Sequence, residues 1–238
     1  MSYTIRPLLN GICQVAGHHA YYKGDPDARY PFLLLVWLVE GPRGPMLVDT
    51  GLEHVAEMNE GAAHVLAEPI VQRPEEDIRA PEDIRCVFIT HLHFDHIDQL
   101  DLYSNARYVV SKRGLEEALA TDPSWAPAKT LELLSETAKH RTLAIDDDEV
   151  YPGIDVVWTG GHSPCSQVVY VRTESGDVAL AGDAIFRIDQ LESNIPIGIY
   201  HDLDDARAAI DKLNSRQAIV LPSHDPAVFE RFPDELIG

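Results

Sequence analysis

The chain has 238 residues, 45% hydrophobic and 24% charged, with 39 acidic against 19 basic residues and a net charge of −20. One composition throughout favours a single domain over residues 1–238 and excludes wholesale disorder. An acidic surface repels phosphate backbones, so we expect no nucleic-acid partner. The longest apolar run, Phe32 to Val39, is too short to cross a bilayer, so we expect no membrane partner.

The start of the chain and its cysteines bear on the compartment. MSYTIRPLLNG has no basic end followed by an apolar stretch, so no secretion signal is predicted. Cys13, Cys86 and Cys165 lie far apart, are odd in number and have no CxxC spacing for zinc, so they do not form a disulfide framework. Together these features predict a cytoplasmic protein.

The first half of the chain is rich in predicted strands, with helices interspersed. Apolar runs predict strands over 32–39, 46–48, 86–90 and 107–111. GPRGP separates the first two, which are therefore predicted to form a hairpin. Residues 61–83 are polar and rich in proline, which predicts a loop with room for one short helix. Helices are predicted over 113–120 and 127–141, where Leu and Ala recur on one side.

The second half repeats this pattern. The acidic run 146–149 leads to a turn at Pro152–Gly153, and strands are predicted over 154–158, 167–172, 178–181 and 218–221. Residues 204–213 are predicted to form an amphipathic helix. Repeatedly, a residue type that binds metals follows directly where a strand ends. That arrangement is expected when stacked sheets present a site on loops at one rim.

The densest group of such residues is His91, His93, Asp95 and His96. In an extended segment, residues i and i+2 point the same way, so His91 and His93 can reach one metal together. Asp95 and His96 follow after a turn and can face a second metal. Imidazole and carboxylate are ligands that Zn²⁺ and similar ions accept. So many polar groups directly after an apolar strand are costly to bury unless their lone pairs are used.

The remaining histidines have an ordinary interpretation. A histidine without such neighbours is usually a surface residue or a core residue with satisfied hydrogen bonds. This interpretation applies by default to His18, His19, His54, His64, His140 and His201.

The segment THLHFDH resembles the HxHxDH signature of the metallo-β-lactamase-fold superfamily, and the rest of that pattern follows in order. LVDTG precedes it, and GGHSP, LAGD and LPSHD supply His162, Asp183 and His224. The resemblance covers almost the whole chain. It implies an α+β fold, an αββα sandwich with the site at one edge of the two sheets.

The resemblance also implies a set of site residues. It assigns His91, His93 and His162 to one metal, Asp95, His96 and His224 to the other, and Asp183 to both. Asp49 resembles a residue that orients a ligand histidine by accepting its other ring N–H, with strand-end capping as the alternative. Zn²⁺ suits these two sites, with Fe, Mn or Co as alternatives. A hydroxide shared by the two ions would attack a carbonyl carbon, with Asp95 and Asp183 as catalytic residues.

Asp183 separates the branches of this superfamily. True β-lactamases place cysteine or serine there, whereas a carboxylate is typical of lactonases and glyoxalase II-like thioesterases. IRPL, PFLLLVWLVEGPRGPMLVDTGL, DLYSNARYVVSKR and AGDAIF are most similar to the N-acyl homoserine lactonase group and related small-lactone hydrolases such as 4-pyridoxolactonase. The implied substrate is therefore a small lactone, and an acyl homoserine lactone would make the enzyme quorum-quenching.

Three positions depart from that group. Phe186 stands where lactonases often have a tyrosine that hydrogen-bonds the substrate carbonyl. The histidine cluster is followed by Ile97 and Asp98 where a glycine is common, and GGHSPCSQ lacks the second histidine or serine-rich context of many relatives.

Substrate contacts are expected from two segments. Residues 17–30 lie before the first long predicted strand. In the lactonase group, a loop at the corresponding place helps to cover the substrate, so these residues are expected to do the same. They could also form a solvated loop. Candidate pocket residues are Tyr21, Tyr22, Phe186, Tyr200 and His201, with His18 and His19 as further contacts. Tyr200 or His201 would replace the missing tyrosine hydroxyl.

Other functions stay open at this stage. They are hydrolysis of another cyclic ester, an amide or a thioester, iron-dependent oxidation of thiols or persulfides, and non-catalytic binding on an inherited fold. The glyoxalase II type carries a basic C-terminal helical region, which the residues after His224 do not resemble. The sequence leaves open whether the chain is a monomer or a homodimer.

Overall fold

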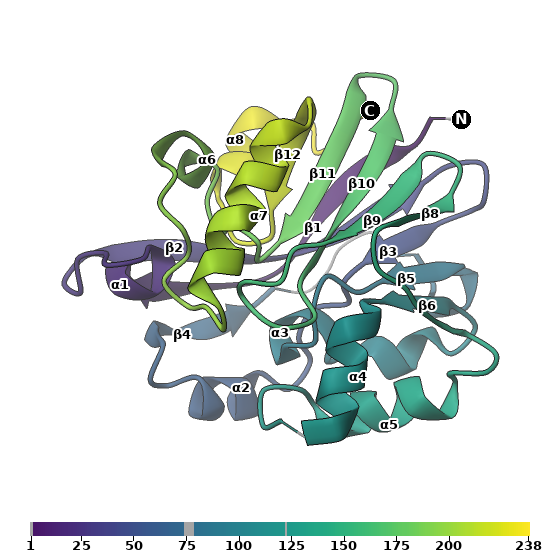
Figure 1. Cartoon of the computed structure of the whole chain (residues 1–238), viewed down its shortest axis with the longest axis horizontal. Coiled ribbons are helices and arrows are strands. Elements are labelled where there is room, and N and C mark those ends of the chain that lie inside the picture. The colour runs from purple at the N-terminus through teal and green to yellow at the C-terminus, as the bar shows by residue number, and fades with distance from the viewer. Residues whose placement is uncertain (1, 74–78, 122) are drawn as a thin grey trace.

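The computed structural model describes residues 2–73, 79–121 and 123–238 and contains two β-sheets (Figure 1). The larger sheet has seven strands in the order β4-β1-β2-β3-β5-β6-β7. These strands are β1 Thr4–Ala16, β2 Arg29–Glu40, β3 Met46–Val48, β4 Leu66–Gln72, β5 Cys86–Phe88, β6 Arg107–Val110 and β7 Thr142–Ala144.

The smaller sheet has five strands in the order β12-β11-β10-β9-β8. These are β8 Asp148–Tyr151, β9 Ile154–Trp158, β10 Gln167–Thr173, β11 Gly176–Gly182 and β12 Ala218–Pro222. β9 and β11 both run antiparallel to β10, and β12 runs parallel to β11. The carboxyl ends of β9, β11 and β12 therefore lie at the same edge of the sheet.

Helices cover the outer face of each sheet. The α-helices are α1 Gly17–Ala20, α2 Val55–Gly61, α3 Phe94–Ile97, α4 Lys112–Thr121, α5 Ala128–Glu136, α6 Asp189–Ser193, α7 Leu203–Ser215 and α8 Ala227–Arg231. Short 3₁₀ helices lie at Pro81–Asp83 and Leu100–Tyr103. α4 and α5 pack on the larger sheet and α7 on the smaller one (Figure 1). The predicted αββα sandwich is confirmed.

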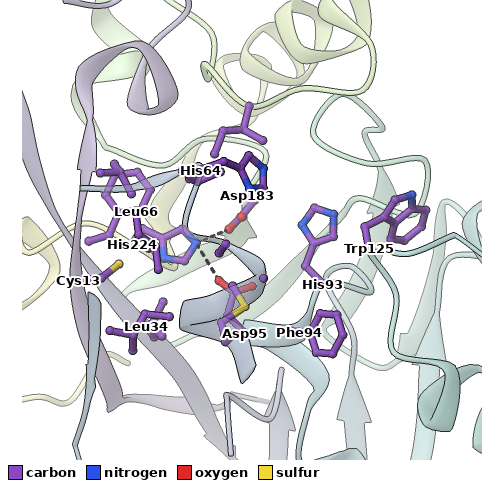
Figure 2. Close-up of a pocket in the computed structure, with 18 of the residues that line it drawn as sticks. Cys13, Leu34, His64, Leu66, His93, Phe94, Asp95, Trp125, Asp183 and His224 are labelled. Carbon is purple, nitrogen blue, oxygen red and sulfur yellow. Dashed lines mark ion pairs between the residues drawn. The ribbon is translucent and has the colours of Figure 1, made fainter. Parts of the chain in front are cut away.

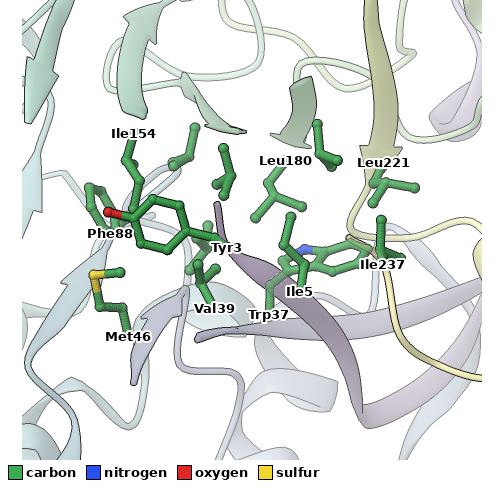
Figure 3. Close-up of a cluster of buried hydrophobic side chains, with 14 of the residues drawn as sticks. Tyr3, Ile5, Trp37, Val39, Met46, Phe88, Ile154, Leu180, Leu221 and Ile237 are labelled. Carbon is green, nitrogen blue, oxygen red and sulfur yellow. The ribbon is translucent and has the colours of Figure 1, made fainter. Parts of the chain in front are cut away.

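The central core lies between the two sheets. Leu33, Leu35, Trp37 and Val39 alternate along β2 and enter this core. Figure 3 shows Trp37 and Val39 facing side chains of the smaller sheet such as Leu180. The intervening residues of β2 face the opposite side, where they join two other apolar clusters. β2 is therefore buried on both faces, which explains why its sequence is a continuous apolar run.

The strand β1 was missed by the sequence analysis, although it is among the longest in the chain. It pairs with β2 over most of its length, with a register shift between Leu9 and Gly11. Its buried and half-buried residues do not alternate regularly. The irregular pattern hides the period of two that identifies a strand.

The loop prediction for residues 61–83 is wrong in part, because Leu66–Gln72 form the edge strand β4. β4 pairs only with β1, so its other edge is free of strand partners within the described residues. An edge strand tolerates Pro69 and polar side chains, which made the segment look like a loop. Residues 74–78 of the predicted loop lie outside the described residues.

Most other predicted elements match within a few residues, with two exceptions. The helix predicted over 127–141 ends at Glu136, and β8 occupies Asp148–Tyr151, directly before the predicted turn. Among the described residues, no helix is both long enough and apolar enough to span a membrane.

Candidate metal centre and substrate cavity

Strand ends deliver every predicted metal-site residue to one edge of the sandwich. Asp49 follows β3, and the histidine cluster comes shortly after β5. In the smaller sheet, His162 follows β9, Asp183 follows β11 and His224 follows β12. Because these strand ends meet at one edge, residues far apart in sequence come together there.

Three overlapping groups of side chains could each hold a metal ion. In every group the potential ligand atoms lie within 4.8 Å of one another. The groups are His91, His93 and His162; His91, His96 and Asp183; and Asp95, His96 and His224. The chain turns into α3 at Phe94, so Asp95 and His96 face a different group from His93.

Asp183 lies between the first and third of these groups. Its Oδ2 is 3.1 Å from Nε2 of His162 and 3.6 Å from Nε2 of His91. Its Oδ1 is 3.0 Å from Nε2 of His224 and 3.4 Å from Nε2 of His96. One carboxylate therefore presents one oxygen to each group, which is the arrangement needed to bridge two ions.

Backbone carbonyls orient two of the histidines. Nδ1 of His162 lies 2.9 Å from the carbonyl oxygen of Ile199, and Nδ1 of His224 lies 2.6 Å from that of Leu33. A carbonyl only accepts, so each Nδ1 carries the proton and donates it. In the neutral ring Nε2 is then unprotonated and offers its lone pair to the centre.

Asp49 orients His96 directly and His91 through the hydroxyl of Thr90. Its Oδ2 lies 2.7 Å from Nδ1 of His96 and accepts a 2.8 Å hydrogen bond from the hydroxyl of Thr90. That hydroxyl lies 3.2 Å from Nδ1 of His91, and because its proton is donated to Asp49 it accepts there. Gly182 has a φ of 51°, and a Cβ on it would come within 2.6 Å of Thr90, so this close packing requires glycine.

The inward atoms of this centre suit a cation. Nε2 of His91, Nε2 of His96 and Oδ1 of Asp183 are buried and have no hydrogen-bond partner among the described residues. Unsatisfied buried polar atoms are costly, and a bound divalent ion would satisfy all three. The donor set of imidazole and carboxylate also suits Zn²⁺ and related ions. The residues present therefore fit metal binding.

The protonation states of the histidines at the centre are also consistent with metal binding. Burial lowers the pKa of His91 and His93 well below the usual range, so both rings are neutral. Burial also opposes charge on His96 and His224, but the neighbouring carboxylates, chiefly Asp183, raise the pKa of both. In the metal-free chain, protonated rings thus compensate the buried carboxylates. A divalent cation would replace those protons.

A cavity of about 600 Å³ opens beside the centre and is lined mainly by apolar side chains. Figure 2 shows Asp95, Asp183 and His224 together on one side, with His93 and Trp125 on the other. The Trp125 ring lies edge-on to that of His93, 5.5 Å between centroids. Strands β1 and β2 form one wall, and the segment from α2 to β4 forms another. An apolar cavity next to a polar centre is typical of a small-molecule site.

Of the five predicted pocket residues, only Phe186 lines this cavity. Its ring packs against those of Phe32, His162 and His224, with centroid distances of 5.2, 5.5 and 5.7 Å. It is 1% exposed and contributes an apolar face to the cavity.

The other four predicted pocket residues do not line the cavity. The hydroxyl of Tyr21 donates to Asp189 on α6, and the Tyr22 ring packs against that of Tyr200. Tyr200 is 40% exposed, and His201 is exposed as well. His18 and His19 are likewise absent from the lining. α1 packs on β1 and β2, and Ala20 and Tyr21 pack in the apolar cluster that contains Phe32 and Phe186.

The sequence analysis missed several cavity residues. Met58 lies in α2, for which no element was predicted, His64 and Leu66 come from the segment predicted as a loop, and Ser124 and Trp125 lie shortly before α5. Single residues of this kind in polar segments indicate nothing about a cavity by themselves.

Comparisons with known proteins agree with the fold. A model of the metallo-β-lactamase superfamily matches residues 29–224. The chain is 29% identical over 211 residues to N-acyl homoserine lactonase AiiA of Bacillus thuringiensis subsp. kurstaki, covering 82% of this chain and 80% of that protein. It is 26% identical over 255 residues to N-acyl homoserine lactonase AttM of Rhizobium radiobacter, covering 94% of each.

A solved structure is similar over nearly the whole chain. It is an N-acyl homoserine lactone hydrolase with the product N-hexanoyl-L-homoserine bound at its catalytic metal centre, with a TM-score of 0.80 and 25% identity, covering 98% of this chain and 99% of that one. The family match begins at the start of β2 and ends at His224, so it includes every residue of the candidate metal centre. The chain is therefore a hydrolase of the metallo-β-lactamase superfamily.

Proposed function

We propose that this chain is a dinuclear metal-dependent lactonase that opens an acyl homoserine lactone or another small lactone. One observation carries the proposal: the Asp183 carboxylate divides its two oxygens between two ligand groups at the end of an apolar cavity. An acyl chain would occupy the cavity while the lactone ring meets the metal centre. The relatives named as N-acyl homoserine lactonases support this substrate class.

In this proposal each ion has its own ligands and shares Asp183. The first ion is held by His91, His93 and His162, and the second by Asp95, His96 and His224. Zn²⁺ suits this set, with Fe, Mn or Co as alternatives. When bound, divalent ions supply Lewis acidity, which polarises a carbonyl and lowers the pKa of water from 15.7 towards about 7.

The side chains of the protein perform the remaining tasks. Asp95 is 14% exposed against 5% for Asp183, so it is the more accessible carboxylate at the cavity. We assign to Asp95 the transfer of a proton from the attacking water to the ring oxygen. Hydroxide then bonds to the carbonyl carbon, the carbon to ring-oxygen bond breaks, and the product is a hydroxy acid. Phe186 supplies no hydroxyl, so carbonyl polarisation rests on the metal centre.

Metal content and a substrate panel test this function. The purified protein is measured for metal per chain, and acid release is followed on acyl homoserine lactones, an aromatic lactone, a thioester and a β-lactam. We expect about two ions per chain and turnover of a lactone. Turnover of the thioester alone would favour the glyoxalase II-like alternative, and oxygen uptake would favour a dioxygenase. A silent panel would contradict the lactonase proposal.

A variant tests the shared carboxylate. Asp183→Ala removes the group that contacts both ligand groups, so metal content and activity should fall together. Glu192→Gln, an exposed carboxylate on α6, is the control and should behave as wild type. Full metal content and full activity in Asp183→Ala would refute the shared role.

A further inference from the structure

A buried carboxylate next to the metal centre has no role in the chemistry above. Asp98 is 2% exposed, and its Oδ2 accepts hydrogen bonds from the backbone N–H groups of Glu53 and His54, at 3.0 and 2.7 Å. Nδ1 of His54 lies 2.9 Å from the same oxygen. The other oxygen, Oδ1, forms a 3.2 Å ion pair with Nζ of Lys129. One carboxylate thus joins two segments far apart in sequence.

Backbone hydrogen bonds fix the position of Asp98 relative to the candidate ligand His96. The carbonyl oxygen of His96 accepts from the backbone N–H groups of Thr50 and Gly51, at 2.6 and 3.3 Å. The backbone N–H of Asp98 donates to the carbonyl of Gly51 at 3.1 Å. These bonds fix Asp98 relative to the metal centre, because His96 and Asp98 lie on the same short segment.

The first segment that Asp98 holds leads into a cavity wall. Glu53 and His54 directly precede α2, and Met58 and Gly61 of that helix line the cavity. α2 has no buried residue and no side-chain cap of its own at His54. Only the partly buried side chains of Val55 and Met58 pack it against the apolar cluster that contains Phe32, so packing alone holds it weakly. The Asp98 carboxylate accepts from the N–H groups of the two residues that precede the helix, and so anchors its start.

The second segment leads into the opposite wall. Lys129 lies in the first turn of α5, and Ser124 and Trp125, just before this helix, line the cavity. Trp125 also contacts the ring of His93. A shift of α5 would therefore move Trp125 relative to His93 and change this wall of the cavity.

We propose that Asp98 is a positioning residue that sets the separation of these two cavity walls, and thereby the acyl chain that the enzyme accepts. The inference deepens the lactonase function proposed above and rests on it. Asp98 is not among the residues that line the cavity or those that form the candidate ligand groups. Its effect should therefore appear in the binding of the acyl chain and leave the chemistry at the lactone ring unchanged.

Kinetics of three variants test the proposal. Asp98→Ala removes all the contacts, Asp98→Asn keeps an acceptor for the Glu53 and His54 N–H groups, and Lys129→Met removes the ion pair alone. Substrates are N-decanoyl homoserine lactone and a lactone ring without an acyl chain. For Asp98→Ala we expect a KM about 10-fold higher for the decanoyl substrate, with kcat and metal content unchanged and no KM change for the bare ring. The other two variants should lie between Asp98→Ala and wild type.

Glu132→Ala is the matched control, since it removes an exposed carboxylate that lies near Lys129 on α5. It should leave KM for both substrates unchanged. A purely structural role for Asp98 would lower the folded fraction, which reduces turnover of both substrates without changing either KM. Equal losses of kcat and metal content would show that Asp98 acts through His96, and this would overturn the proposal.

Hydrogen exchange separates failure of this inference from failure of the lactonase function. The Glu53 and His54 amides, and the peptide containing Ser124 and Trp125, should exchange faster in Asp98→Ala than in wild type. If wild type hydrolyses no lactone, the lactonase function fails, and exchange still decides whether Asp98 holds both walls. If exchange and KM are unchanged in Asp98→Ala, the inference about Asp98 is wrong while the lactonase function stands.

Discussion

Asp49 has a left-handed backbone, with a φ of 64°, directly after β3. Its Oδ1 accepts from the backbone N–H of Thr90 at 2.8 Å, while its Oδ2 lies against His96. The side chain is fully buried, so both oxygens depend on these partners. At this position one carboxylate links the end of β3 to the histidine cluster after β5.

Asp49→Asn tests this link without straining the backbone, since asparagine also tolerates positive φ. The amide keeps an acceptor but loses the charge that holds Nδ1–H of His96. We expect zinc affinity to fall by about 10- to 100-fold while the fold is retained. Competition with a chromophoric chelator measures the zinc affinity. Asp147→Asn, at a φ of 53° outside the site, is the control, and equal affinities in both variants would contradict the role.

The three thiols should be unreactive in the native protein. Burial raises the pKa of Cys13 and Cys86 to about 12 and that of Cys165 to about 11. The reactive thiolate is therefore scarce at about pH 8, even for Cys13 beside the cavity. We expect a disulfide reagent to label the native protein slowly and all three thiols rapidly after denaturation. Rapid native labelling of Cys13 would show that the thiolate forms in the cavity.

At the scale of elements, α7 illustrates a helix that the sequence predicted and the structure connects to the site. Asp202 caps its start, accepting from the backbone N–H groups of Asp204 and Asp205 at 2.9 Å each. The backbone N–H groups of His201 and Asp202 donate to the carbonyl of Gly161, which precedes His162. The start of α7 thus supports the loop that carries one candidate ligand.

Asp202→Ala should destabilise this helix start. Loss of an N-cap costs about 1 kcal/mol, which for a chain of this size lowers Tm by about 2–4 °C. Thermal unfolding of the metal-loaded protein measures the shift. Asp202→Ser retains a capping oxygen and should recover most of it. An unchanged Tm in Asp202→Ala would mean that the cap does not contribute to stability.

Sheet edges mark the limit of prediction at this scale. The central strand β2 is buried on both faces, so its sequence must be a continuous apolar run, and that run made it predictable. β4 pairs on one side only, and most of its residues are exposed or half-buried. Its sequence therefore lacks both alternation and hydrophobicity. Local sequence therefore predicted the buried strand β2 and missed this edge strand, which exists because β1 offers it hydrogen bonds.

For the molecule as a whole, charge is the dominant property that composition sets. A net charge of −20 makes the folded chain repel itself, and folding concentrates these charges. At about 10 mM salt the Debye length is about 30 Å, and it falls below about 8 Å at 0.5 M. Repulsion across the molecule is therefore screened by added salt.

We expect Tm to rise when NaCl is increased from about 10 mM to about 0.5 M, because screening reduces repulsion in the folded state. The protein is kept saturated with metal, so that changes in metal binding do not contribute. Potassium chloride should have the same effect at equal ionic strength. A Tm that falls with salt would show that attractive surface pairs outweigh the net repulsion.

The sequence by itself determined which side chains gather at the rim of the sandwich. The local pattern alone identified the histidine cluster after an apolar strand, and the resemblance to the superfamily signature added His162, Asp183 and His224. Only the tertiary structure decided what orients them and what forms the cavity. The carbonyl that holds His224 belongs to Leu33, 191 residues away, and the one that holds His162 belongs to Ile199, 37 residues away. Every residue has a backbone carbonyl, so no side-chain pattern marks these partners, and only folding brings them into contact.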